Sequence, residues 1–214
     1  MISKIACMIL GIALVGIRKL GVDHAPGFFF GPLSFGALIA PTIGFFAGPS
    51  ACLGVWLIRT AALLCEKASL GAFFVYIPTL CGALVLSSPS RALKVLIPLL
   101  CMILFIAHPV GRSSWIYTLY WLIPLGIGCI SSPSVIARSI ASTYTTHAVG
   151  STLFLYSRTT SPDFWLMLVN QVWYERLCYA LLLTACYYTL TFVQNFLSAV
   201  WSERNLCQIP LSSS

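Results

Sequence analysis

The sequence has very few charged residues. Asp, Glu, Lys and Arg make up only 8% of its 214 residues, whereas a soluble domain carries about 25%. Hydrophobic residues make up 59%, and the mean hydropathy is +0.93. No segment is polar enough to form a water-soluble domain, and the apolar runs are continuous, as is typical of membrane helices. The composition therefore predicts an all-α integral membrane protein.

Several kinds of site are missing from the sequence. The 12 basic residues exceed the 5 acidic ones, but they lie singly at the ends of apolar runs, so no basic face is available for nucleic acid. The nine cysteines show no CxxC or Cys/His spacing, which argues against a metal site or a disulfide framework. No HExxH, GxSxG or P-loop motif occurs. We therefore expect no enzyme activity, no cofactor and no ATP hydrolysis by this chain itself.

The apolar runs predict a compact bundle of six to eight transmembrane helices in the cell (inner) membrane. We expect one integral membrane domain over residues 1–200 and a short polar tail over 201–214. The first run ends in basic residues without an A-x-A cleavage site, which favours a membrane helix over a signal peptide. Several runs are shorter than the roughly 20 residues of a perpendicular span. The runs are Ile2–Leu20, Phe28–Pro49, Ala51–Cys65, Gly71–Leu86, Ala92–Ala107, Trp115–Ile130, Val135–Tyr156 and Phe164–Val200.

Small residues recur at four-residue steps in the second run, at Gly36, Ala40, Gly44 and Gly48. This spacing places them on one helix face, where another helix can approach closely. The stripe indicates either ordinary packing within the bundle or docking of a partner subunit's helix. Pro41 lies within the same run and should kink or break its helix.

A short pattern occurs twice, as LSSPS at 86–90 and ISSPS at 130–134. Tyr76 and Tyr120 are in step with it, as are Gly82 and Gly126. Each Ser-Ser-Pro is a good helix start, with Ser88 or Ser132 as N-cap and proline at the first helical position. A spacing of two crossings predicts that both turns lie on the same side of the membrane. The Ser161-Pro162-Asp163 sequence predicts another helix start, with an acid in the first turn.

Polar residues at membrane depth are concentrated between residues 142 and 184. His147 and Ser151 share a helix face, and beyond a turn at 158–163 the chain returns as an antiparallel neighbour. There Glu175 lies at a depth similar to that of His147. Buried ionisable groups in a membrane mark functional sites by default. We therefore predict a polar, aromatic-rich binding site for an organic solute, formed by His147, Ser151, Asn170, Gln171, Trp173, Tyr174 and Glu175.

Structural roles for the same groups remain open at this point. His147 is either a satisfied hydrogen-bonding partner between helices or a ligand contact. Glu175 is either paired with an arginine, for which Arg138 or Arg176 is available, or a ligand contact. Because adjacent helical residues point about 100° apart, we expect Glu175 and Arg176 to have different partners.

Two segments carry a resemblance to a known family. HAVGSTLFLY (147–156), a short turn and then FWLMLVNQVWYERLCYALLLT (164–184) resemble the C-terminal half of substrate-binding (S) components of energy-coupling factor transporters. FFFGPLSFGALIAPTIGFFAG (28–48) resembles their early helices. The resemblance implies a six-helix vitamin-binding core that docks on a transmembrane coupling subunit with two ATPases. The small-residue stripe is the nearest match to the docking surface, but no motif for a particular vitamin is present.

The leading hypothesis from the sequence is a substrate-binding subunit for uptake of a vitamin or similar organic micronutrient, energised by partner ATPase subunits. A stand-alone ion-coupled permease for a small solute is the second hypothesis. A membrane scaffold that transports nothing is the third.

Overall fold

The computed structural model describes residues 35–65, 76–88 and 90–206, and within these ranges the chain forms helices and no strands. In chain order the elements are α2 (Phe35–Ala47), α3 (Pro49–Cys65), α5 (Ile77–Ser87), α6 (Arg91–Ala107), α7 (Pro109–Ser113), the 3₁₀ helix η2 (Trp115–Trp121), α8 (Leu122–Cys129), α9 (Val135–Ser157) and α10 (Pro162–Leu206). The all-α prediction is therefore confirmed for the described residues. The expected first helix, Ile2–Leu20, and residues 207–214 of the expected tail lie outside them.

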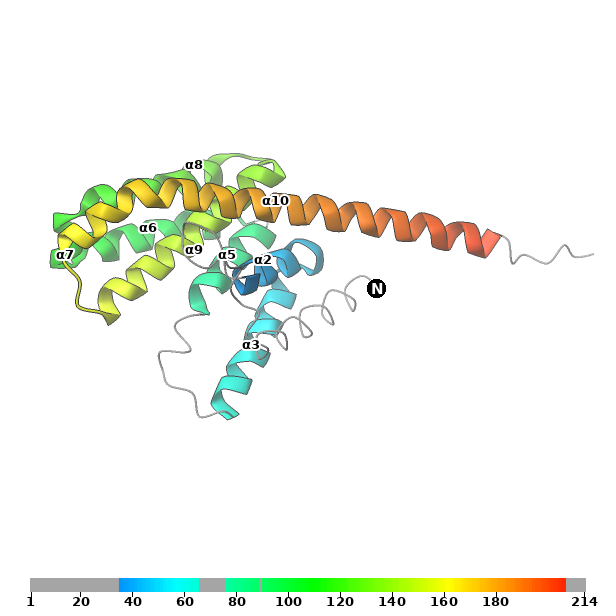
Figure 1. Cartoon of the computed structure of the whole chain (residues 1–214), viewed down its shortest axis with the longest axis horizontal. Helices are drawn as coiled ribbons and strands as arrows, with labels where there is room; N and C mark the ends of the chain where they lie inside the picture. Colours follow the sequence, from blue (N-terminus) through cyan, green and yellow to red (C-terminus); the bar gives the residue numbers. More distant parts are fainter. Residues whose placement is uncertain (1–34, 66–75, 89, 207–214) are drawn as a thin grey trace, which may run out of the picture.

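Helix α9 is the centre of the fold and packs against α5, α6, α8, α10 and η2 (Figure 1). Its buried face is made largely of alanine, serine and threonine, and such small side chains allow neighbouring helices to approach closely. The closest approach is to α5 at Gly82, where an added Cβ would lie 1.9 Å from the Thr146 hydroxyl oxygen. The Ser142 hydroxyl also donates to the Gly82 carbonyl at 2.8 Å.

Large aromatic side chains fill the space on another side of α9. Phe105 of α6, Tyr117 and Trp121 of η2 and Trp165 of α10 are each at most 1% exposed. Phe105 lies edge-on to Trp121 and Trp165, with ring centroids 5.3 and 5.0 Å apart, a geometry that aromatic pairs prefer. This aromatic cluster holds η2 between α6 and α10.

Helices α6 and α9 begin at the same end of the bundle. Arg138, in the first turn of α9, donates through Nε to the carbonyl of Leu86 near the end of α5, at 3.1 Å, and also through Nη2. The starts of the two helices therefore lie together, whereas a position of both turns on one side of a membrane stays a prediction. The predicted N-caps are wrong by two residues, because the helices begin at Arg91 and Val135, with Ser90 and Ser134 as N-caps.

Two other predicted boundaries have different outcomes. Helix α10 begins at Pro162 with Asp163 in its first turn, and the Ser161 hydroxyl accepts from the Phe164 amide at 3.4 Å, so this start is confirmed. Helix α2 continues through Pro41 and ends at Ala47. The next residue is Gly48, whose φ of +82° suits glycine. The break between α2 and α3 therefore lies at Gly48 and not at the proline.

Helix α10 is much longer than the bundle that it covers. Its 45 residues span about 68 Å at 1.5 Å per residue, and its C-terminal part extends beyond the other helices (Figure 1). Within it, Pro162–Val200 is the one described stretch that is both long and apolar enough to cross a membrane, and only 11% of its apolar window is buried. The prediction of six to eight crossings is not established by these helices.

Candidate functional site

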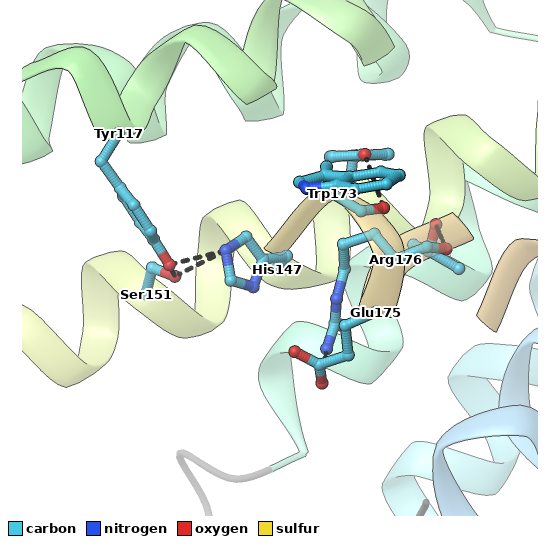
Figure 2. Close-up of polar contacts among 8 residues, drawn as sticks. Tyr117, His147, Ser151, Trp173, Glu175 and Arg176 are labelled. Atoms are coloured by element: carbon cyan, nitrogen blue, oxygen red, sulfur yellow. Dashed lines mark hydrogen bonds and ion pairs between the residues drawn. The ribbon is translucent and has the colours of Figure 1, made fainter. Parts of the chain in front are cut away.

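Three polar side chains meet between η2 and α9 (Figure 2). The Tyr117 hydroxyl lies 2.6 Å from Nε2 of His147 and 3.0 Å from the Ser151 hydroxyl, and Ser151 lies 3.4 Å from the same His147 nitrogen. His147 and Ser151 are one helical turn apart, so α9 alone places them together. We call Tyr117, His147 and Ser151 the polar triad.

The surroundings of the polar triad fix its geometry. Tyr117 is 1% exposed and Ser151 is 7% exposed. The Tyr117 ring lies 5.1 Å from the Trp165 ring and 5.6 Å from the Phe105 ring. Because these neighbours leave the phenol little freedom, its hydroxyl is held against His147. Buried tyrosine hydroxyls usually find such a partner.

The hydrogen bonds of the polar triad leave one nitrogen of His147 available for a further hydrogen bond. The Tyr117 hydroxyl can donate to one partner and accept from the other, so one proton arrangement satisfies both contacts. These contacts use Nε2 of His147, and its Nδ1 has no hydrogen bond to any described residue. Nδ1 is therefore the group through which the triad can accept from, or donate to, a further molecule.

Sequence reasoning places His147 and Ser151 together, and the structure confirms this pairing, but it misses Tyr117. Tyr117 lies 30 residues before His147, inside the apolar aromatic run WIYTLYW. The only signal in that run is chemical, because a tyrosine among buried aromatic residues needs a hydrogen-bond partner.

A charged pair lies on α10 near the polar triad. Arg176 donates through Nη2 to a Glu175 carboxylate oxygen, so the expectation that these neighbours have different partners is wrong. Their long side chains bend back towards each other despite pointing apart at Cβ. Figure 2 shows the pair and the triad in one region, on the neighbouring helices α10 and α9 and on η2.

The other arginine considered for Glu175 is used elsewhere. Arg138 binds the Leu86 carbonyl and lies over the Phe45 ring, 5.1 Å from its centroid. Arg176 lies over the Tyr179 ring at 4.9 Å, and its Nε is buried without a hydrogen-bond partner among the described residues. The Glu175–Arg176 pair thus carries an unused donor.

The remaining predicted site residues on α10 differ in how far their side chains are exposed. Trp173 is 50% exposed and Asn170 is also exposed, whereas Gln171 and Tyr174 are half-buried. The Tyr144 hydroxyl of α9 donates to the Trp173 carbonyl at 3.4 Å. Trp173 therefore presents its ring outwards from this part of α10, while its backbone contacts α9. Solute contact by these four residues stays a prediction.

At Gly44, the small-residue stripe on α2 packs against other helices of the same chain. A Cβ added at Gly44 would lie 2.9 Å from the Cys52 sulfur and 3.1 Å from the Ala83 carbonyl oxygen. Gly48 follows the end of the helix, and no atom of the described residues lies within 4 Å of a Cβ added there. The side chains at positions 36 and 40 lie outside the described part. Ordinary packing therefore explains Gly44, and partner docking through the stripe stays a prediction.

The described side chains contain no group of three or more His, Cys, Asp and Glu residues arranged to hold a metal ion.

Similarity to known proteins gives no further indication of what the site binds. No family model, no curated protein and no solved structure matches it.

Proposed function

We propose that this protein is a multi-pass membrane protein that binds a small organic solute, and that it serves as the substrate-binding subunit for uptake of a vitamin-like micronutrient. In this proposal partner ATPase subunits supply the energy. The Nδ1 of the half-buried His147 has no hydrogen bond to a described residue, while its Nε2 is held by the buried Tyr117 and Ser151 next to the Glu175–Arg176 pair; this is the observation that carries the proposal.

The outer faces of the helices support a membrane environment. Large apolar side chains project from α6, from η2 and α8, and from α10, and such extended apolar surface is rare on soluble monomers. Exposed examples are Leu96, Leu100 and Ile103 on α6, Trp115, Leu119 and Leu122 on η2 and α8, and Leu181, Phe192 and Phe196 on α10. A bilayer would cover all three faces at once.

The chemistry of the site supports a solute with both an aromatic ring and polar groups. The triad offers an imidazole nitrogen, and the charged pair offers a carboxylate and a guanidinium within the same region. Beside the triad, the rings of Phe105, Trp165 and Tyr117 pack on one another and make the setting apolar. Few polar groups in a mostly apolar setting are typical of small-molecule sites.

A thermal-shift panel of vitamins on the purified protein tests the proposal. We expect one class of compound to stabilise the wild type. His147→Gln should bind it about five- to thirtyfold more weakly, since a hydrogen bond to a polar ligand contributes roughly 1–2 kcal/mol. Tyr156→Phe is the control, because it removes a hydroxyl that donates to the Leu104 carbonyl at the exposed end of α9. Co-purification with ATPase subunits tests the energy source.

A membrane scaffold is the second candidate, favoured by one observation. Glu175 and Arg176 satisfy each other within the chain, as structural ion pairs do. If no compound in the panel stabilises the protein, if it purifies without ATPase subunits, and if His147→Gln changes only folding yield, the scaffold is correct and solute binding is refuted.

A further inference from the structure

One N–H group of Arg176 is buried and unused. Its Nε has no hydrogen-bond partner among the described residues, although Nη2 of the same guanidinium binds Glu175. The Arg176 side chain is only 14% exposed and lies over the Tyr179 ring. A buried donor without a partner is costly, so an acceptor from outside the described chain would stabilise this group.

The packing of α10 on α9 brings Arg176 to the level of the polar triad. The Thr143 hydroxyl of α9 donates to the Arg176 carbonyl at 3.4 Å, and His147 follows Thr143 by one turn on the same helix face. The two helices are antiparallel and are joined by a short turn at 158–161. Side chains in a helix lean towards its N-terminus, and on α10 this direction leads from Thr143 towards His147.

The free nitrogen of His147 lies on the side of this charged pair. Figure 2 shows Nδ1 turned away from Tyr117 and Ser151 and towards the side on which Glu175 and Arg176 lie. Two N–H positions without a partner in the described chain, one from each helix, therefore occur in the same region.

The hydrogen bonds of the polar triad make Nδ1 of His147 a donor. The Ser151 hydroxyl has no acceptor among the described residues other than Tyr117 and His147. If it donates to Tyr117, the Tyr117 hydroxyl can donate to Nε2 of His147, and both hydroxyl hydrogens are used. If Nε2 carried the hydrogen instead, one hydroxyl hydrogen would have no acceptor in the triad. An imidazole that accepts at Nε2 carries its hydrogen on Nδ1.

The Glu175–Arg176 pair determines which kind of acceptor can bind. The positive charge of Arg176 is already compensated by the carboxylate that it binds. A second carboxylate at Nε would lie close to Glu175, and like charges at short range repel one another. An uncharged carbonyl oxygen accepts from an N–H group without this repulsion.

We propose, building on the solute binding proposed above, that the solute carries an uncharged carbonyl group, as in a carboxamide or a ring lactam. This group accepts hydrogen bonds from Nε of Arg176 and from Nδ1 of His147. A carbonyl oxygen has two lone pairs and can take both donors. Arg176 is thus a specificity-determining residue, and its pairing with Glu175 disfavours carboxylates.

The test compares vitamins with and without such a group by thermal stability of the whole purified chain. Nicotinamide, riboflavin and biotin carry an uncharged carbonyl, whereas thiamine, pyridoxine and nicotinate do not. Nicotinamide and nicotinate are a matched pair, because they differ only in carboxamide against carboxylate. We expect a vitamin of the first group to stabilise the wild type, and nicotinamide to bind about tenfold or more tightly than nicotinate.

Arg176→Lys isolates the role of Nε, because lysine keeps a positive charge for Glu175 but has no N–H at that position. It should bind the stabilising carbonyl vitamin about tenfold to a hundredfold more weakly, as expected for loss of one charge-assisted hydrogen bond. Arg158→Lys, at the exposed end of α9, is the control and should bind as the wild type does. Circular dichroism checks that both variants fold, and the ranking of vitamins on the wild type needs no variant.

Two results would overturn this assignment and leave solute binding intact. In the first, only thiamine, pyridoxine or nicotinate stabilises the wild type. In the second, folded Arg176→Lys binds a carbonyl vitamin as tightly as the wild type does. Stabilisation by none of the six compounds or the remaining vitamins of the panel would instead refute solute binding itself, and this assignment with it.

Discussion

The contact of α5 with α9 at Gly82 leads to a sharp prediction for Gly82→Ala. The new Cβ would lie 1.9 Å from the Thr146 hydroxyl oxygen and 3.0 Å from the Ser142 carbonyl oxygen. Thr146 can relieve the first contact only by rotating, which breaks its 2.9 Å hydrogen bond to the Ser142 carbonyl. The second contact involves backbone and is relieved only if the two helices separate.

Separation of the helices has its own cost. It would stretch the bond from the Ser142 hydroxyl to the Gly82 carbonyl, which is 2.8 Å long. Overpacking typically costs about 1–3 kcal/mol, and a lost buried hydrogen bond about 0.5–1.5 kcal/mol. We therefore expect Gly82→Ala to lower the free energy of unfolding by roughly 2–4 kcal/mol.

Gly126→Ala is the matched control, because Gly126 also lies within a helix and no atom in the described part of the chain lies within 4 Å of an added Cβ. There alanine should stabilise the protein by up to about 1 kcal/mol through its higher helix propensity. Equilibrium unfolding of both variants in mixed detergent, followed by circular dichroism, measures the difference. Equal stability of Gly82→Ala and the wild type would refute the described contact between α5 and α9.

Two further changes test other contacts. Tyr117→Phe should destabilise the protein by about 1–2 kcal/mol in the same unfolding assay, because it leaves His147 and Ser151 only their longer mutual contact of 3.4 Å. Tyr156→Phe should have a smaller effect, because its hydroxyl lies at an exposed position. Equal effects of the two changes would contradict the burial of Tyr117. Gly48→Ala should cost about 1 kcal/mol, because φ is +82° there although space is open; a neutral result in that assay would mean that α2 and α3 are not joined through a left-handed residue.

The sequence predicts the helices of this chain well where an apolar run has clear ends. The expected Val135–Tyr156 and Ala92–Ala107 helices differ from α9 and α6 by a single residue at an end. Strong chemical signals mark these ends, since serine and proline favour helix starts. The N-caps are displaced by two residues because a proline can precede the N-cap as well as follow it.

The candidate site is less predictable, for a physical reason. His147 and Ser151 are brought together by one helix, so their spacing is enough to predict it. Tyr117 reaches them through tertiary packing of an aromatic run, and no local pattern encodes that contact. The sequence offers Arg176 as one possible partner of Glu175, but the directions of the two Cβ atoms argue against this pair, and side-chain flexibility overrides those directions.

The length of α10 has a consequence for how the C-terminal end of the helix is maintained. Most side chains between 192 and 199 are exposed, so neighbouring helices of the described chain give them no packing energy. An isolated helical stretch of this size is only marginally stable in water. In hydrocarbon, its backbone N–H groups can bond only to backbone carbonyls of the same helix. The segment will thus fray in water and stay helical within lipid, so the rate of its amide hydrogen exchange reports which medium surrounds it.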